Sequence, residues 1–179
     1  MIINGIAALR CWPITITLGG RQYRIAPRPA LDWIIPIVNG TPDIIVPGML
    51  DPTDTTIDDM LIDGTITLTD CYRAAQDAVS TAAGMPWWAA HRLVATAVES
   101  PALAGALILA GVDTSVVSLA AVCAATYRVL TEQADEKQLA KLEQELMATP
   151  PGVPVEQRYD ARAAASAFEA AAAARGVEL

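Results

Sequence analysis

The sequence of 179 residues is poor in aromatic residues, histidine and cysteine, and each shortage excludes a kind of chemistry. Aromatic residues make up only 5% of the chain, so its core cannot depend on many large rings. The only histidine is His91, and the three cysteines, Cys11, Cys71 and Cys123, are far apart. Such a set makes no plausible zinc site, and an odd number of cysteines is no disulfide framework. We therefore expect buried free thiols, a reducing compartment, and neither a metal nor another cofactor.

Positive charge is scarce as well. Twelve lysine and arginine residues face 20 aspartate and glutamate residues, which gives a formal net charge of −8 at pH 7. Binding to nucleic acid requires a basic face that displaces counterions from the phosphates. An anionic membrane surface would repel this chain for the same reason. The charge therefore predicts a soluble protein with no nucleic-acid partner and no membrane partner.

Long hydrophobic runs are also missing. The first 13 residues lack a basic segment, and Asn4 and Gly5 interrupt their apolar run, so we expect no secretory signal. The best membrane candidate is residues 101–127, but its purely apolar part is only about a dozen residues, too short to span a bilayer. We expect two buried helices there, with Gly111 and Asp113 between them. The nearly all-apolar first helix should be central.

No motif of an enzyme stands out. The sequence contains neither G-x-S-x-G nor a P-loop, and any catalytic triad would depend on His91 as its imidazole. A Cys–His pair would require Cys71 or Cys123 to lie near His91, which the sequence alone leaves open. We expect a protein that is not an enzyme.

Six aspartates fall within residues 51–70, with no basic residue among them. Their spacing does not match an EF-hand, which needs acids at alternate positions and a final glutamate. Helix caps and first turns are suitable positions for such acids. There are two further interpretations: the aspartates form a surface that contacts a basic partner, or they are simply solvated. The six are Asp51, Asp54, Asp58, Asp59, Asp63 and Asp70.

Strand-like alternation is confined to residues 13–26. Ile14, Ile16 and Leu18 alternate with threonines, Gly19-Gly20 can adopt the positive φ angles of a two-residue turn, and Tyr23 continues the alternation. This pattern predicts a β-hairpin. A hairpin alone is marginally stable, so it must pack on helices or join a neighbour's sheet.

The rest of the chain predicts a mainly α protein, with one compact helical domain over residues 1–149. A short helix should cover residues 31–37 and end or kink at Pro36, and residues 41–50 suit a short helix or a buried loop. From Thr69 the apolar spacing stays helical. Expected helices cover 69–83 before Gly84, 87–99 after Pro86, 102–111, a segment starting at Thr114 or Ser115, and 135–147 with Leu139, Leu142 and Leu146 on one stripe. A Pro-rich linker (150–157) and an Ala-rich C-terminal helix (158–179) should follow.

Two of the four tryptophans are adjacent, Trp87 and Trp88. Successive helical residues point about 100° apart, so the two rings must face different surroundings. The residues that share a helix face with each ring place Trp87, with Val94, toward the core and Trp88 at the rim beside Arg92. The alternative is that both tryptophans lie in the core. Tryptophan and arginine are frequent at interface hot spots. Our candidate partner-binding residues are Trp33, Trp87, Trp88, Arg92 and Tyr127.

The order of motifs resembles the tail assembly chaperones of long-tailed phages that infect actinobacteria. The resemblance covers roughly residues 15–152, but the Ala-rich end does not align. Five stretches carry it: LGGRQYRIAPRPALDW, IIVPGMLD, AAGMPWWAAHRLVATAV, GALILAGVDTSVVSLAAVCAATYRVL and ELMATPPG.

The resemblance implies a non-enzymatic assembly factor in the host cytoplasm. Such proteins are thought to coat the long tape measure protein and to hold it soluble until tail-tube subunits polymerise around it. The implied partners are the tape measure protein, further copies of the chain and a tail-tube subunit. A ribosomal frameshift commonly gives the family a second, longer form, and this chain would be the short one. The alternative class is a structural virion protein, such as a head–tail connector or tail completion subunit.

Overall fold

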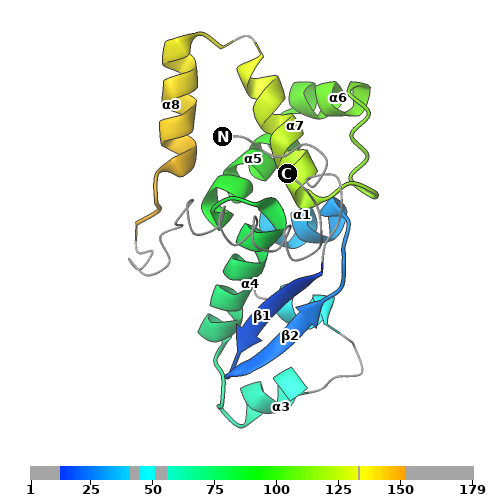
Figure 1. Ribbon diagram of the computed structural model, residues 1–179, viewed down its shortest axis with the longest axis vertical. Coiled ribbons are helices and arrows are strands. Elements are labelled where there is room, and N and C mark those ends of the chain that lie inside the picture. Colours follow the sequence, from blue (N-terminus) through cyan, green and yellow to red (C-terminus); the bar gives the residue numbers. More distant parts are fainter. Residues whose placement is uncertain (1–12, 41–44, 51–55, 133, 152–179) are drawn as a thin grey trace, which may run out of the picture.

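The computed structural model describes residues 13–40, 45–50, 56–132 and 134–151. Within these ranges the protein is mainly helical, with a two-stranded antiparallel hairpin at its N-terminal side (Figure 1), which confirms the predicted fold class. Most of the predicted linker and all of the predicted C-terminal helix (158–179) lie outside the described residues, as do Asp51, Asp54 and Cys11.

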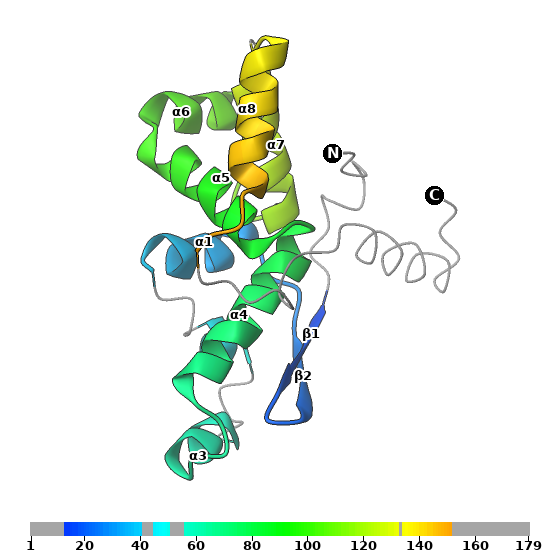
Figure 2. The same cartoon turned by 90° about the vertical axis from the view of Figure 1, so that its left-hand side faces the viewer.

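The hairpin consists of β1 (Ile14–Leu18) and β2 (Arg21–Ile25), paired so that Ile16 lies opposite Tyr23. Ile14, Ile16 and Leu18 are buried and the intervening threonines are exposed, as the alternation predicts. One face of the hairpin packs on a long helix, α4 (Leu68–Ala83) (Figure 2). This packing supplies the support that an isolated hairpin lacks.

The hairpin turn depends on two glycines in the left-handed conformation, Gly19 (φ 55°) and Gly20 (φ 74°). A Cβ on Gly19 would overlap the Met60 side chain and approach Ile66 to 2.9 Å, whereas a Cβ on Gly20 would meet open space. We expect either glycine-to-alanine change to cost about 1–2 kcal/mol through the left-handed backbone. Gly19→Ala should cost about 1–3 kcal/mol more, because it overpacks the core. Urea denaturation of the two variants measures the difference, and equal costs would contradict the tight packing at Gly19.

Helix boundaries follow local capping chemistry. α4 begins with a capping box in which the side chain of Thr67 accepts from the Asp70 N–H (3.2 Å) and that of Asp70 accepts from the Thr67 N–H (2.8 Å). The Asp70 carboxylate also accepts from the Thr67 hydroxyl (2.7 Å), and this hydrogen bond, followed by the one from the Thr67 N–H, lowers the pKa of Asp70. α4 ends at Gly84, which has a left-handed φ of 66°, as predicted. The helices are α1 (Ala30–Val38), α2 (Ile45–Met49), α3 (Thr56–Ile62), α4, α5 (Trp87–Glu99), α6 (Pro101–Leu109), α7 (Leu119–Thr131) and α8 (Glu136–Met147).

α5 is at the centre of the helical body, because it contacts α1, α4, α6, α7 and α8. Its buried residues, which include Trp88, Leu93 and Val94, join the hairpin and α1 in the main core. α3 lies at the far end of α4, next to the hairpin turn, while α6, α7 and α8 gather at the opposite end (Figures 1 and 2). α8 contributes only Leu146 to the set of buried residues, with Leu139 and Leu142 half-buried on the predicted stripe.

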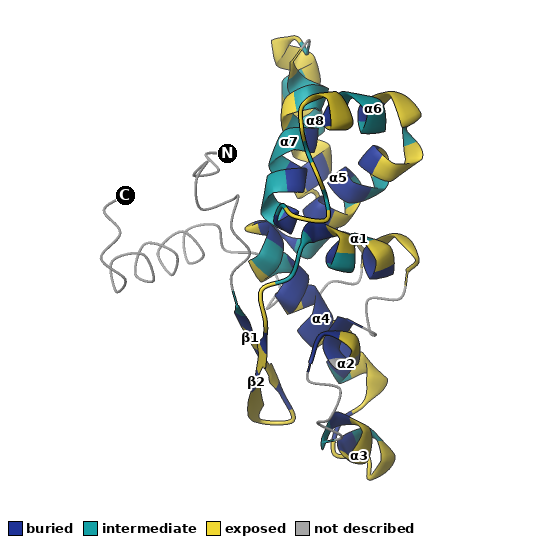
Figure 3. Ribbon diagram, turned by 90° about the vertical axis from the view of Figure 1, so that its right-hand side faces the viewer, coloured by how far each residue is buried: buried dark blue, intermediate teal, exposed yellow. Residues whose placement is uncertain are grey.

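The prediction that α6 is central is wrong. Only Leu103 and Leu107 of this helix are buried, whereas Ile108 is 71% exposed and Leu109 is 90% exposed. Figure 3 shows α6 at the margin of the body with much of its surface exposed. The reason is the sharp corner at Ser100, where α5 and α6 are bent by 95°. An all-apolar helix also has no polar side by which the sequence could reveal its solvent face.

The start of α7 was predicted too early. The cap is Ser118, whose hydroxyl accepts from the Ala121 N–H, and not Thr114 or Ser115. The carboxylate of Asp113 accepts hydrogen bonds from the N–H (2.9 Å) and hydroxyl (2.6 Å) of Ser115. This local turn competes with helix formation, so the helix is delayed.

Two further observations concern membranes and metals. No single helix in the described ranges is long and apolar enough to cross a membrane, and the only pair that passes on length and composition is the bent pair α5 and α6. The same part of the chain contains no group of three or more His, Cys, Asp or Glu residues placed to hold a metal ion. Cys71 and Cys123 are buried, and burial raises the pKa of Cys123 to about 12.

Candidate partner-binding pocket

A tight corner between α4 and α5 places Trp87 against α4. The N–H groups of Gly84 and Met85 both donate to the carbonyl of Ser80, at 2.9 and 3.3 Å. The hydroxyl of Ser80 accepts from the Trp87 N–H (3.0 Å) and donates to the carbonyl of Gln76 (2.9 Å). Pro86 immediately precedes α5 and is buried. The corner is thus held by backbone geometry, and the first indole of α5 has a defined position.

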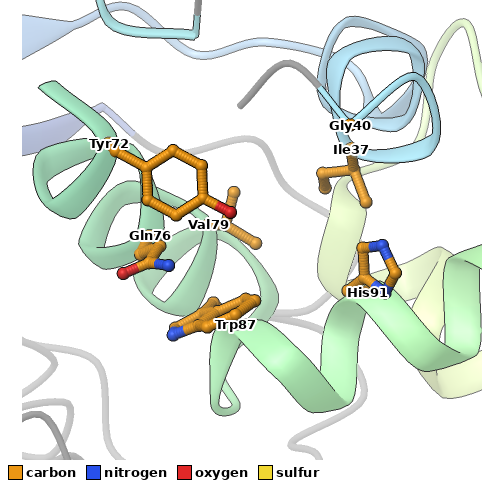
Figure 4. Close-up of a pocket in the computed structure, with 7 residues that line it drawn as sticks. All are labelled: Ile37, Gly40, Tyr72, Gln76, Val79, Trp87 and His91. Carbon is orange, nitrogen blue, oxygen red and sulfur yellow. The ribbon is translucent and has the colours of Figure 1, made fainter. Parts of the chain in front are cut away.

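Beside this corner is a small, mainly apolar pocket between α1, α4 and α5 (Figure 4). The ring of Tyr72 and the ring of His91 lie on opposite sides of it, with Val79 and Trp87 between them. Its volume is about 90 Å³, well below the roughly 300 Å³ of the smallest usual ligand sites. The pocket therefore suits one aliphatic side chain of a partner and not a cofactor. Its lining residues are Ile37, Gly40, Tyr72, Gln76, Val79, Trp87 and His91.

The polar groups of the pocket are the Tyr72 hydroxyl, the Gln76 amide and the His91 imidazole. The seven lining residues include no carboxylate, thiol, serine, lysine or arginine. His91 therefore has no nucleophile or orienting carboxylate beside it in this lining, and acid–base catalysis there has no partner group. The arrangement is suited to recognition of an apolar group.

The two tryptophans have exchanged the places that stripe composition predicted. Trp88 is 4% exposed and lies in the core, while Trp87 is half-buried and lines the pocket. The rings meet edge to face, with centroids 5.8 Å apart and planes at 84°. The indole N–H of each ring is buried without a hydrogen-bond acceptor among the described residues. The residue available to a partner at this corner is therefore Trp87.

The prediction failed because it treated Arg92 as a sign of a solvent-facing stripe. In the structure Arg92 reaches the C-terminal end of α8, where its Nη1 donates to the carbonyls of Leu146 (3.1 Å), Ala148 (2.8 Å) and Glu145. A long side chain can cover apolar surface with its stem while its charged end meets polar groups. The stripe that contains Arg92 is therefore compatible with a buried Trp88.

α1 also carries an exposed apolar stripe. Leu31, Ile35 and Val38 recur at spacings of four and three residues, so they share one helix face, and each is more than a third exposed. The opposite side of α1 buries Trp33 and Ile37. Ile37 and Gly40 line the pocket, so the stripe faces away from the pocket wall that α1 provides. We call Leu31, Ile35 and Val38 the α1 stripe.

The other predicted site residues have different surroundings. Trp33 is 2% exposed and belongs to the core, so it offers no surface to a partner. The hydroxyl of Tyr127 donates to Glu143 Oε1 (2.7 Å) and thereby ties α7 to α8. Partial burial, followed by the bond to Glu143 and its charge, raises the pKa of Tyr127 to about 12. Of the five candidates, only Trp87 lines the pocket.

Sequence reasoning missed Tyr72 and His91 as members of one surface. Nothing in the pattern singled out Tyr72, and His91 was considered only as a metal-binding or catalytic candidate. Nearly every residue from Ala30 to Val38 is apolar, so spacing alone could not show which face is exposed. Comparison with protein-family models, curated proteins and solved structures found no match for this chain.

Proposed function

We propose that this protein is a tail assembly chaperone of a long-tailed phage, which binds the tape measure protein in the host cytoplasm and keeps it soluble until the tail tube forms. One observation carries the proposal beyond the resemblance of motifs. The GMPWW stretch, which is among the resembling segments, forms the corner that places Trp87 in an apolar pocket, whose lining also includes the exposed Tyr72.

This surface has the chemistry required to hold a helical client. A tape measure protein is a long helical chain with exposed apolar stripes, and an amphipathic helix is recognised through anchors at i, i+3, i+4 and i+7. The pocket can accept one such anchor, and the exposed ring of Tyr72 in its lining can cover the next. A site of this size is weak, but many copies along one client multiply their effect. Weak individual sites also allow the tail-tube subunits to displace the chaperone.

The test is coexpression with the tape measure protein encoded by the same phage. We expect the wild-type chain to keep that protein in the soluble fraction, and Tyr72→Asp to weaken binding at least about tenfold, as expected for a hot-spot residue. Tyr72 lines the pocket and is 40% exposed, so the variant should fold. Ile62→Asp is the matched control, because Ile62 is 85% exposed on α3, far from the pocket (Figure 1).

Two results would contradict the proposal. One is a tape measure protein that stays insoluble with the wild-type chain, and the other is an equal loss of solubility with Tyr72→Asp and Ile62→Asp. Quantitative mass spectrometry distinguishes an assembly chaperone from the alternative class, a structural virion protein. An assembly factor is abundant in infected-cell lysate and missing from purified particles, whereas a structural virion protein has a fixed copy number in the particle.

A further inference from the structure

The helix α8 is a peripheral element that few side chains hold in place. It lies at the margin of the helical body and is joined to α7 by residues 132–135 (Figure 1). Leu146 is its one buried residue, Leu139 and Leu142 are half-buried, and all its other residues are exposed. A helix of about twelve residues is marginal by itself in water. α8 is therefore stable only while it packs against the rest of the protein.

The contacts that hold α8 recognise a kind of helix more than a particular sequence. Arg92 on α5 donates to main-chain carbonyls at the C-terminal end of α8, those of Leu146 and Ala148 among them. The last carbonyls of any helix lack partners within that helix, so Arg92 can bind the end of any helix placed here. The Tyr127 hydroxyl requires only one acceptor side chain, which in α8 is Glu143.

The sequence of α8 shows which other helix would fit the same position. Residues 139–146 read LAKLEQEL, so leucines recur at spacings of three and four on one helix face, with the acceptor Glu143 between them. The helix ends at Met147, one residue after the last leucine. A helix with the pattern L-x-x-L-E-x-x-L and an end at this point can make the contacts of α8 with Arg92 and Tyr127. Helix recognition in other proteins uses apolar anchors at this spacing.

We propose that α8 is a displaceable internal ligand, which covers a docking surface on α5 and α7 until an amphipathic helix of another protein with this pattern takes its place and ends at Arg92. The short connection 132–135 keeps α8 at an effective concentration of the order of millimolar. A single unrelated apolar segment therefore competes poorly with it. A partner that presents several such helices multiplies its strength and displaces α8.

The occupant is another protein and not a second copy of this chain. A second copy offers the same helix with the same contacts, but at a far lower concentration than the resident α8, so an exchange between copies gains nothing. The docking surface is also separate from the pocket of the proposed function, which no residue of α7 or α8 lines. Either site can therefore fail its test without affecting the other.

The experiment measures the binding of a labelled peptide with the sequence of residues 134–151 to the full-length chain, by fluorescence anisotropy. The wild-type chain should bind the peptide weakly, because its own α8 occupies the surface. Leu146→Asp in the chain removes the buried anchor of the resident helix, so the peptide should bind at least about tenfold more tightly. Met147→Asp is the matched control, because Met147 is the next residue and is 45% exposed. This variant should bind the peptide like the wild type.

Arg92 shows whether the peptide occupies the position of α8. The double variant Leu146→Asp/Arg92→Ala also releases α8, but it lacks the group that binds the end of the entering helix. The gain from Leu146→Asp should therefore be lost. A peptide in which the residue equivalent to Leu146 is aspartate should bind none of the chains. Circular dichroism and thermal unfolding establish that each variant is folded.

Four results would overturn the proposal. The first is no binding of the peptide to folded Leu146→Asp, and the second is equal binding to this variant and to the wild type. The third is a gain that persists after Arg92 is removed. The fourth comes from sedimentation velocity without peptide: a wild-type dimer that Leu146→Asp converts to a monomer would make the α8 of a second copy the occupant.

Discussion

Replacing Trp88 with alanine is expected to lower the free energy of unfolding by about 3–5 kcal/mol, the usual cost of deleting a large buried ring. Trp88 is 4% exposed and packs edge to face on Trp87. Since a domain is stable by only about 5–15 kcal/mol in total, this change should leave the protein close to unfolding. Urea denaturation followed by circular dichroism measures the loss without depending on tryptophan fluorescence.

Trp87→Ala is the matched comparison, because it removes the same side chain from the neighbouring position. Trp87 is only partly buried at the pocket, so its replacement should cost less than Trp88→Ala, because it removes less apolar area from the core. Trp88→Phe should also be mild, because the indole N–H that it removes has no acceptor in the described part of the chain. If Trp87→Ala proved the more destabilising change, the arrangement first predicted from the stripes would be correct.

Arg92→Ala should loosen α8 while the rest of the fold stays intact. The guanidinium of Arg92 meets carbonyls at the C-terminal end of α8, which have no partner within the helix, and α8 buries only Leu146. Hydrogen bonds to a charged group contribute about 1.5–3 kcal/mol, so amide exchange in α8 should accelerate about 10- to 100-fold. Hydrogen–deuterium exchange resolved by segment checks this result, and α4 should retain its protection.

The control for this prediction is Arg128→Ala, which removes an exposed arginine from the last turn of α7. A surface change of this kind usually alters stability by no more than about 0.5 kcal/mol. Arg92→Lys should restore only part of the protection, because an ammonium is more strongly hydrated than a guanidinium and leaves water less readily for these carbonyls. Unchanged exchange of α8 in Arg92→Ala would show that leucine packing alone holds this helix.

The sequence correctly predicted the features that depend only on residues close together in the chain. The hairpin follows from strict alternation around Gly19-Gly20, and the ends of α4 and α5 follow from Gly84 and from the break at Ser100-Pro101. These features depend on backbone conformations that few residues adopt. They are therefore visible without knowledge of the packing partners.

The sequence did not predict which side of a helix is buried, because that depends on the other elements that pack against the helix. α6 and α1 are both almost entirely apolar, so no periodicity distinguishes their buried and exposed faces. The orientation of the Trp87–Trp88 pair depends on α8, which covers the Arg92 side of α5 although it lies some 50 residues later. The pocket likewise requires α1, α4 and α5 to meet, and only the last two are neighbours in sequence.

The start of α1 has a consequence for the order in which the protein can fold on the ribosome. Pro29 precedes this helix and provides no side-chain cap. The N–H groups of Ala30 and Leu31 instead donate to the carbonyls of Val117 (2.8 Å) and Thr114 (3.0 Å), more than 80 residues later. Domains are synthesised from the N-terminus at about 5–20 residues per second, so α1 emerges several seconds before the groups that complete it. Until then its apolar face is open in the nascent chain, and the N-terminal half can reach its final packing only after the turn before α7 has left the exit tunnel.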